Sequence, residues 1–267
     1  MKVGIISSPS EMFCTTLNSP IPSKPTILKA HGLFCSHLEF SMVTPYLQDY
    51  HVLLVDLPEH SHPVETPLSF ASAIASLVQA IKKHSPTSKV HIVGVSLGGH
   101  IALELAHLHP ELVSSVFASG CSPISGSKKW LGEHPLVMYA LAATVMKTDW
   151  LYWWTSNQMG MLKHEELHGK MKKKITVGLV RRGFGGLLEI RFEHSAGIKD
   201  FRTLVTAGEK GDDVEGTREM RRLLKKKYEQ SMAFMAAGGS WLGLKVSGVV
   251  CEWSEGSGRG GGNPCGV

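Results

Sequence analysis

The chain has 267 residues, of which 43% are hydrophobic and 19% are charged, and its net charge is +5. These values fit one globular domain with a large core, because α/β folds commonly exceed 200 residues as a single unit. They exclude a transmembrane protein, since no stretch approaches eighteen consecutive apolar residues, and the first residues are not typical of a signal peptide.

Charge and cysteine usage predict no nucleic-acid, metal or disulfide partner. The basic runs 170–174 and 221–227 have no interleaved aromatic residues, so we interpret them as solvated helix faces. The five cysteines are scattered, odd in number and contain no C-x-x-C pair, which indicates neither a zinc site nor a disulfide framework. We therefore expect a cytoplasmic protein with no cofactor, no metal and no membrane partner, and the sequence leaves the oligomeric state open.

Short apolar runs that end at turn residues alternate with helical segments along the chain. This pattern predicts a parallel sheet with crossover helices. Strands are predicted at 26–30, 51–55, 90–93, 112–118 and 201–207, and 244–250 is a candidate for the last strand. Helices are predicted over 70–81, from 97 to about 108 and from 214 to about 227, where Asp213 is a candidate N-cap.

Residues 127–200 interrupt this alternation. They contain many methionines and four tryptophans at helical spacing, with few strand signals. We expect a helical cap here, inserted after a sixth strand, with residues 1–126 and 201–267 forming the core. The composition shifts near Gln230, where we expect an atypical, glycine-rich tail to begin. Residues 238–267 contain ten glycines, so the chain from about Gly256 onward is predicted to be irregular and exposed.

The main candidate catalytic motif of the sequence is Gly94-Val95-Ser96-Leu97-Gly98. A serine at a sharp turn between a strand and a helix is raised clear of the sheet, and the small neighbours permit the tight turn. The motif follows a predicted strand and opens an amphipathic helix, which is the context that a nucleophile elbow requires. A phosphate-binding loop is the alternative, but no lysine follows the glycines.

His31-Gly32-Leu33 follows the first predicted parallel strand. The glycine permits a turn that directs the Leu33 amide toward the nucleophile, where it would form an oxyanion hole with the Leu97 amide. The His31 side chain is interpreted as a structural group that hydrogen-bonds the loop.

With these motifs, the chain resembles the capped, single-domain members of the α/β-hydrolase superfamily over about residues 25–227. The segments 56–60 and 207–213 add to the resemblance. It implies a mostly parallel sheet flanked by helices, and a serine hydrolase that acts on a small, largely apolar ester or related carbonyl compound. Ser96 is then the nucleophile, and the acid of the triad is Asp212, with Asp213 as the alternative.

The sequence departs from this family at the catalytic base, which should be a histidine that follows the acid. The last of the fourteen histidines is His194, before Asp212. His60, His62, His100 and His194 are interpreted as surface or loop residues rather than substitutes. The alternative function is therefore a catalytically inactive or ligand-binding member, and we expect a carboxyl terminus lost or replaced by truncation or missplicing.

A second motif, His164-Glu165-Glu166-Leu167-His168, matches H-E-x-x-H. On a helix this spacing places two imidazoles on one face, as in zinc metalloproteases. Charged neighbours and the lack of a clear third ligand make a zinc metalloprotease the more distant alternative.

Overall fold

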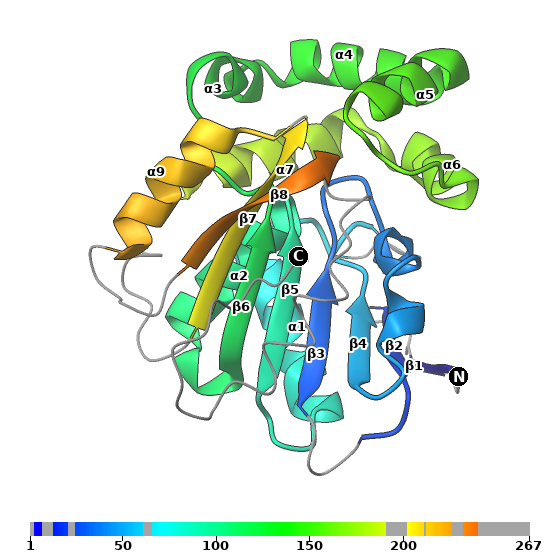
Figure 1. Ribbon diagram of the computed structural model, residues 1–267. Coiled ribbons are helices and arrows are strands. Elements are labelled where there is room, and N and C mark those ends of the chain that lie inside the picture. The colour runs from blue at the N-terminus through cyan, green and yellow to red at the C-terminus, as the bar shows by residue number, and fades with distance from the viewer. Residues whose placement is uncertain are drawn as a thin grey trace.

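The computed structural model describes residues 3–6, 13–20, 25–60, 66–190, 202–210, 212–225 and 232–239. These residues contain an eight-stranded sheet in the order β1-β2-β4-β3-β5-β6-β7-β8 (Figure 1). The strands are β1 Val3–Ile6, β2 Cys14–Leu17, β3 Thr26–Ala30, β4 His51–Val55, β5 Val90–Val95, β6 Val113–Ser119, β7 Arg202–Lys210 and β8 Met232–Gly239. β1 and β2 pair antiparallel, and β2 pairs antiparallel with β4. The six neighbouring strands β4, β3, β5, β6, β7 and β8 are parallel to one another.

The parallel strands β3 and β4 are buried on both faces of the sheet. Every residue of β3 and β4 is buried. Successive residues of a strand point to opposite faces, and here they belong to two separate apolar clusters. Leu28 and Leu53 are in the larger cluster, whereas Ile27 and Val52 are in the smaller one. Burial on both faces explains why these strands have continuous apolar sequences without alternation.

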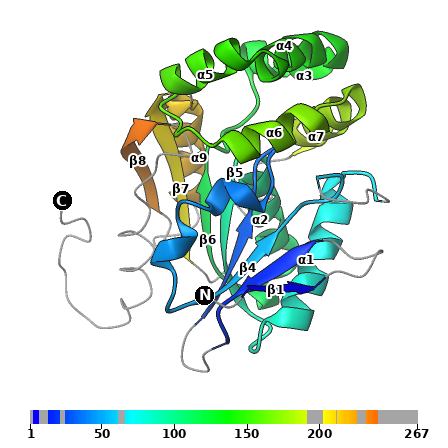
Figure 2. The same ribbon diagram turned by 90° about the vertical axis from the view of Figure 1, so that its right-hand side faces the viewer.

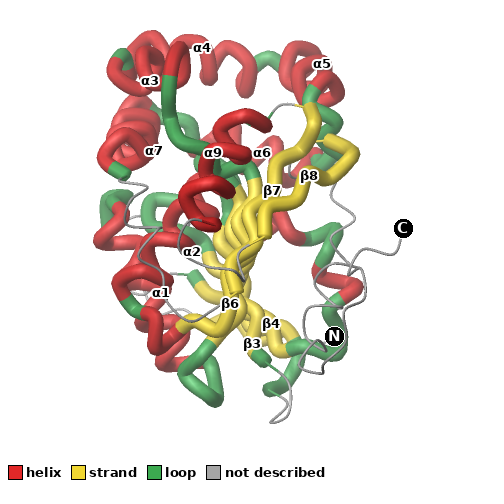
Figure 3. The backbone as a smooth tube through the Cα atoms, turned by 60° about the vertical axis from the view of Figure 1, so that its left-hand side comes forward, coloured by secondary structure: helices red, strands yellow, loops and turns green. Residues whose placement is uncertain are grey.

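Three long helices flank the sheet: α1 Phe70–His84, α2 Leu97–Leu108 and α9 Val214–Lys225. α2 packs on β5 and β6, α1 lies beside α2, and α9 packs on β7 (Figure 3). α1 begins with a capping box in which the Ser69 hydroxyl accepts from the Ser72 amide. The 3-10 helices are η1 His37–Phe40, η2 Thr44–Tyr46 and η3 Pro110–Leu112.

Among the described residues, five helices are inserted between β6 and β7, over the carboxyl ends of the parallel strands (Figures 1 and 2). These inserted helices are α3 Gly126–Glu133, α4 Pro135–Lys147, α5 Asp149–Gln158, α6 Glu165–Lys174 and α7 Val177–Glu189. α6 and α7 lie next to the core, while α3, α4 and α5 form an outer layer. Arg182 on α7 donates to the Glu59 carboxylate at 2.8 Å, so an ion pair joins the inserted helices to the loop after β4.

The predicted parallel strands and the three predicted helices are confirmed within a few residues. Two corrections concern strands. The antiparallel pair β1 and β2 was not predicted, and the strand after α9 is β8 at 232–239, where a glycine-rich tail was expected to begin. The predicted strand at 244–250 and the irregular segment from Gly256 lie outside the described residues. Among the described residues, no helix is both long and apolar enough to cross a membrane.

Candidate active site

Ser96 lies between the end of β5 and the start of α2, in a strained backbone conformation. Its φ of 50° and ψ of −116° are rare for a residue with a side chain and cost about 1–3 kcal/mol. The Ser96 amide donates to the Ser119 carbonyl at 2.7 Å, at the end of the neighbouring strand β6. The turn is tight, because a Cβ on Gly94 would lie 2.3 Å from the Gly98 carbonyl oxygen. This is the backbone of a nucleophile elbow.

Gly98 brings the start of α2 into contact with the end of β3. A Cβ on Gly98 would lie 2.1 Å from the Ala30 carbonyl oxygen and 2.7 Å from that of His31. Because both neighbours are backbone atoms, they cannot move aside as a flexible side chain could. Glycine at this position therefore places the elbow directly against the loop that begins at His31.

We expect Gly98→Ala to destabilise the protein by at least about 1–3 kcal/mol, because the new methyl group overlaps backbone atoms. Thermal unfolding measures this effect. The matched control is Gly169→Ala on α6, where no neighbouring atom lies within 4 Å of the new Cβ. That change should stabilise the helix by up to about 1 kcal/mol. Equal effects of the two substitutions would contradict the close contact at Gly98.

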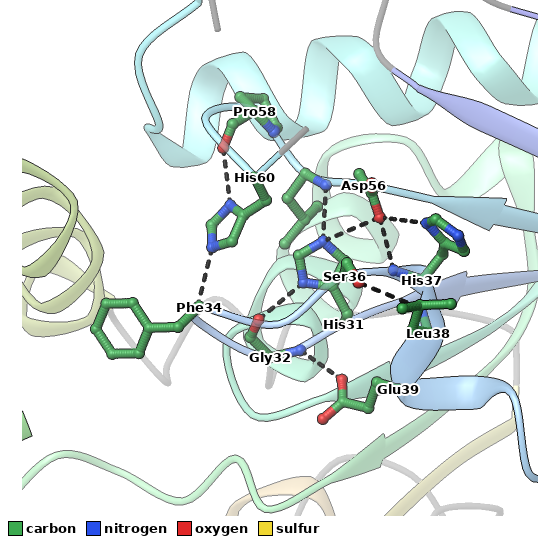
Figure 4. A network of polar contacts seen from close by, with 11 residues as sticks. His31, Gly32, Phe34, Ser36, His37, Leu38, Glu39, Asp56, Pro58 and His60 are labelled. Carbon is green, nitrogen blue, oxygen red and sulfur yellow. Dashed lines mark hydrogen bonds and ion pairs between the residues drawn. The ribbon is translucent and has the colours of Figure 1, made fainter. Parts of the chain in front are cut away.

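The loop after β3 is held by a network of buried hydrogen bonds (Figure 4). The His31 ring bonds to the Gly32 carbonyl oxygen through Nδ1 and accepts from the Leu57 amide through Nε2. The Gly32 amide donates to the Glu39 carboxyl at 2.8 Å. The Phe34 amide donates to His60 Nε2 at 3.1 Å. The expected structural role of the His31 side chain agrees with these contacts.

The Leu33 amide is the exception in this loop. The amides of Gly32, Phe34 and Cys35 all have acceptors, whereas that of Leu33 makes no hydrogen bond within the part of the chain that the structure describes. The Leu97 amide, in the first turn of α2, likewise has no acceptor among the described residues. The α7 backbone packs on the Leu33 side chain, since a Cβ on Gly183 would lie 2.6 Å from Leu33 Cδ1.

Asp212 lies after β7, next to the end of β6. Its carboxylate accepts from the Gly208 amide at 2.8 Å. A Cβ on Gly120, which immediately follows β6, would lie 3.1 Å from Asp212 Oδ1. The negative charge of Asp212 also adds to burial in raising the pKa of the Cys121 thiol to about 12, and Cys121 contacts Gly99 of the elbow. These contacts bring Asp212 to the same edge of the sheet as Ser96.

Asp213 has a different set of partners. Its Oδ1 accepts from the Gly216 amide at 2.8 Å, and its carbonyl oxygen accepts from the Thr217 amide at 3.0 Å. Asp213 therefore caps α9, as the sequence predicted. Lys128 of α3 lies 3.8 Å from its other carboxylate oxygen. Of the two candidate acids, Asp212 has the carboxylate that faces the end of β6.

The structure thus combines a strained serine, placed between a parallel strand and a helix, with an insertion after β6. This combination is typical of one fold family. A family model described as the alpha/beta hydrolase fold matches residues 25–157. The chain belongs to the α/β-hydrolase superfamily.

The curated relatives that the chain resembles include an AB hydrolase superfamily protein and a lipase. An AB hydrolase superfamily protein of Gibberella zeae is 38% identical over 102 residues, which are 37% of this chain and 36% of the relative. A monoacylglycerol lipase of Xenopus laevis is 30% identical, over 43% of this chain and 36% of that protein. The matches thus span little more than a third of these two curated relatives.

The fold likeness extends over nearly the whole chain. An α/β-hydrolase enzyme from a deep-sea metagenome has a TM-score of 0.72 at 12% identity, covering 96% of this chain and 99% of that one. An esterase from Exiguobacterium antarcticum has a TM-score of 0.69 at 14% identity, covering 91% and 96%. At these identities the likeness shows the α/β-hydrolase fold, but it shows neither an activity nor a substrate.

Two of the histidines considered as substitute bases are buried. His60 lies in a loop, as expected, whereas His100 lies on helix α2, which corrects its interpretation as a surface or loop residue. His60 bonds to the Pro58 carbonyl oxygen through Nδ1 and to the Phe34 amide through Nε2, so both ring nitrogens are occupied. Burial lowers the pKa of His60 to about 3, and that of His100 to about 3. A general base works best with a pKa near the working pH, so these two imidazoles are poor candidates. His62 and His194 lie outside the described residues.

The H-E-x-x-H motif does not form the helical zinc face that its spacing predicts. α6 begins at Glu165, and His164 is its N-cap, with Nδ1 accepting from the Leu167 amide. His164 Nε2 bonds to the Ser41 hydroxyl, and His168 stacks on the Tyr152 ring and bonds to the Met146 carbonyl oxygen. The two imidazoles therefore have different structural partners. No group of three metal-ligating side chains is formed by the residues that the structure describes.

Sequence reasoning missed Glu39 and the role of Asp56. Asp56 accepts from the His37 amide at 2.6 Å and contacts the His37 ring at 2.9 Å. Burial raises the pKa of Asp56, but these hydrogen bonds outweigh it and hold the pKa below its usual range. Glu39 accepts from an amide seven residues earlier and Asp56 contacts His37 nineteen residues earlier, and no local motif reveals either contact.

A cavity of about 970 Å³ lies between α7, the start of α1 and the α3–α4 junction. It is lined by residues such as Phe70, Arg181 and Ile190, and it includes none of the predicted catalytic residues. We therefore do not equate it with the substrate pocket.

Proposed function

We propose that this α/β hydrolase is built for serine hydrolase chemistry on a small ester or related carbonyl compound, by acyl transfer to water. The strained elbow at Ser96 is the observation that carries the proposal. A serine held at positive φ at the head of α2 has its hydroxyl next to the amide groups that open the helix.

In this proposal Ser96 Oγ attacks the carbonyl carbon, and the carbonyl oxygen becomes negatively charged. The Leu33 and Leu97 amides, which have no other acceptor among the described residues, would donate to that oxygen. The alcohol leaves with a proton, and water then attacks the acyl group on Ser96. Because no histidine follows Asp212, water would take the Ser96 proton and protonate the leaving alcohol in this chain. Asp212 would orient an imidazole for both steps only where a histidine is supplied. No cofactor or metal is part of this chemistry.

We further propose that the inserted helices act as a cap. In this division residues 127–200 form the cap, and residues 1–126 and 201–267 form the catalytic core. The contact of Gly183 with Leu33 and the ion pair of Arg182 with Glu59 support it, because both join α7 to the loops around the proposed oxyanion hole. The apolar side chains that α4 and α7 contribute to the main apolar cluster favour an apolar acyl group.

A fluorophosphonate probe tests the nucleophile directly, because it reacts with an activated serine and needs no turnover. We expect slow, stoichiometric labelling of Ser96 in the wild-type chain and none in Ser96→Ala. Mass spectrometry of the labelled peptide locates the adduct. The matched control is Ser119→Ala, a buried serine at the end of the neighbouring strand, which should still be labelled. Absence of labelling at Ser96 would contradict the proposed nucleophile.

The second candidate function is a catalytically inactive, ligand-binding member of the superfamily. The absence of any histidine after Asp212 favours it. The two functions differ in turnover rather than in fold, so ester hydrolysis no faster than that of Ser96→Ala is the result that this alternative requires.

A further inference from the structure

Glu39 is a buried carboxyl without a counter-ion among the described residues. Only 4% of this residue is exposed, although acidic side chains are almost never buried to this extent unless they are paired. Oε2 accepts from the Gly32 amide, whereas Oε1 has no hydrogen-bond partner in the described ranges. The Cys35 thiol lies close to the carboxyl, but a thiol is a weak donor. This geometry favours the uncharged acid, because burying an ion with one unsatisfied oxygen costs far more.

The peptide group that joins Gly32 to Leu33 is fixed through its carbonyl oxygen. This oxygen accepts from the Cys35 amide at 3.2 Å and from His31 Nδ1 at 2.8 Å. In a trans peptide the N–H points away from the C=O, so these two bonds direct the Leu33 N–H away from His31 and Cys35. The Leu33 amide is thereby left available as a donor, which is what the proposed oxyanion hole needs.

This orientation needs anchors on both sides of the Gly32–Leu33 peptide. Gly32 has no Cβ and rotates more freely than any other residue, and Phe34 is held at a φ of 69°, which is unfavourable for a residue with a side chain. His60 holds the Phe34 amide on the carboxyl-terminal side. Glu39 holds the Gly32 amide on the amino-terminal side, and Figure 4 shows it reaching Gly32 from the side of the loop opposite to His60.

We propose that Glu39, as an uncharged carboxyl, is the positioning residue of the oxyanion hole, and that it acts through the Gly32 amide. This inference rests on the proposed function, because it takes Ser96 as the nucleophile and the Leu33 amide as an oxyanion donor. The absence of charge on Glu39 matters as much as its hydrogen bond. A carboxylate behind this loop would repel the negative charge that develops on the carbonyl oxygen of the substrate.

The charge of Glu39 changes within a range of pH that experiments can reach. Burial raises the pKa of its carboxyl to about 8, so the carboxyl is neutral below this pH and becomes a carboxylate above it. Two other titratable groups lie on the same side of the loop. Burial raises the pKa of Cys35 well above its usual value and that of Tyr152, on α5, to about 12. Neither group therefore becomes charged near pH 8.

The groups on the other side of the loop leave the effect of Glu39 distinguishable. Burial lowers the pKa of His31 and of His60, so both rings stay neutral near pH 8. Asp56 stays ionised, because its hydrogen bonds with His37 outweigh the effect of burial and hold its pKa below the usual range. Burial lowers the pKa of Lys29, on β3, to about 7, so this group does titrate. A comparison between variants at the same pH cancels its contribution, because all of them contain it.

Rates of fluorophosphonate labelling of Ser96 from pH 6 to pH 9.5 test the positioning role in the full chain. Glutamine accepts from the Gly32 amide and does not titrate, so Glu39→Gln and the wild type should react at the same rate near pH 6. By pH 9.5 Glu39→Gln should react at least about fivefold faster than the wild type, because it carries no charge behind the loop. Glu39→Ala leaves the Gly32 amide without its acceptor and should react at least about tenfold more slowly than Glu39→Gln at every pH.

The matched control is Thr26→Val, at the amino end of β3. Thr26 is buried and bonds to His51 Nδ1 at 3.0 Å, so its loss destabilises the protein without touching the loop after this strand. Thr26→Val should melt at a lower temperature than the wild type but be labelled at the same rate while folded. Equal slowing by Thr26→Val and Glu39→Ala would overturn the proposal. So would a ratio of Glu39→Gln to wild type that is the same at every pH, and this pair decides even if Glu39→Ala does not fold.

Amide NMR spectra of the wild type and Glu39→Gln report on the loop independently of Ser96. We expect the Gly32 and Leu33 amide resonances of the wild type to shift with a midpoint near pH 8, and those of Glu39→Gln to stay constant. These shifts without any labelling of Ser96 would overturn the proposed nucleophile, while still showing that Glu39 controls the Leu33 amide. Labelling of Ser96 with no shift of the two amides would overturn the role of Glu39 alone.

Discussion

The 267-residue chain should hydrolyse p-nitrophenyl esters at no more than about 10³–10⁴ times the uncatalysed rate. This residual rate is what oxyanion stabilisation and substrate binding supply when a triad lacks its base. Without an imidazole beside it, the Ser96 hydroxyl keeps its proton and is a weak nucleophile. Initial rates with p-nitrophenyl acetate and butyrate, compared with Ser96→Ala, measure the residual activity.

Restoring the base should restore turnover. β8 is parallel to β7, so its carboxyl end lies at the same edge of the sheet as Asp212. We expect that a histidine introduced shortly after Gly239, as Ser240→His, Trp241→His, Leu242→His or Gly243→His, raises the rate by orders of magnitude in at least one position. That gain should disappear with Ser96→Ala.

The restored variant also separates Asp212 from Asp213. Asp212→Asn should have little effect in the wild-type chain, where there is no imidazole to orient, but a large effect once a histidine is present. Asp213→Asn should mainly reduce stability, because Asp213 caps α9.

Fast hydrolysis by the unmodified chain, lost on Ser96→Ala, would contradict the prediction that this chain has only residual esterase activity. Another histidine would then be the base, and alanine substitution of His60, His62, His100 and His194 in turn would identify it. His60 and His100 are the least suited, because burial lowers the pKa of each to about 3.

The sequence predicts the parts of the fold whose signals are local. Near-continuous apolar runs predict the buried parallel strands, and the predicted elbow coincides with a serine at positive φ. β2 was missed because it has only four residues, and it becomes a strand by pairing with β4. β8 consists of alanine, glycine, methionine and one phenylalanine, without β-branched residues, so its conformation depends on pairing with β7.

The contacts that fix the loop after β3 could not be predicted, because they join residues that no motif relates. His60 and Phe34 are 26 positions apart, and the pairing of Arg182 with Glu59 spans 123 positions. Glu39 lies in a segment that sequence reasoning left without a role. Its contact with the Gly32 amide depends on how η1 folds back beneath the loop.

Glu39→Gln should make the protein more stable at pH 8 than the wild type, while leaving stability near pH 5 almost unchanged. Burial raises the pKa of the Glu39 carboxyl to about 8, against the hydrogen bond from the Gly32 amide, which lowers it. The folded protein therefore keeps the Glu39 proton at pH values where the unfolded chain, with a pKa near 4.5, has lost it.

The sign follows from proton linkage. Between pH 4.5 and pH 8 the folded state binds more protons at Glu39 than the unfolded state, so the free energy of unfolding falls as pH rises through this window. One pKa unit corresponds to about 1.4 kcal/mol, so the loss from this single group reaches a few kcal/mol by pH 8. Glutamine resembles the protonated acid, accepts from the Gly32 amide through its carbonyl oxygen, and does not titrate.

Urea unfolding of the wild type and of Glu39→Gln at pH 5, 6, 7 and 8 measures the effect. The difference between the two proteins at each pH removes the contributions of the buried histidines and of Lys29, because both proteins share them. We expect this difference to grow steadily from pH 5 to pH 8. Glu133→Gln, at an exposed carboxylate, is the control and should give a difference that is small at every pH. A difference for Glu39→Gln that does not change with pH would mean that the Glu39 carboxyl is already ionised beneath the loop.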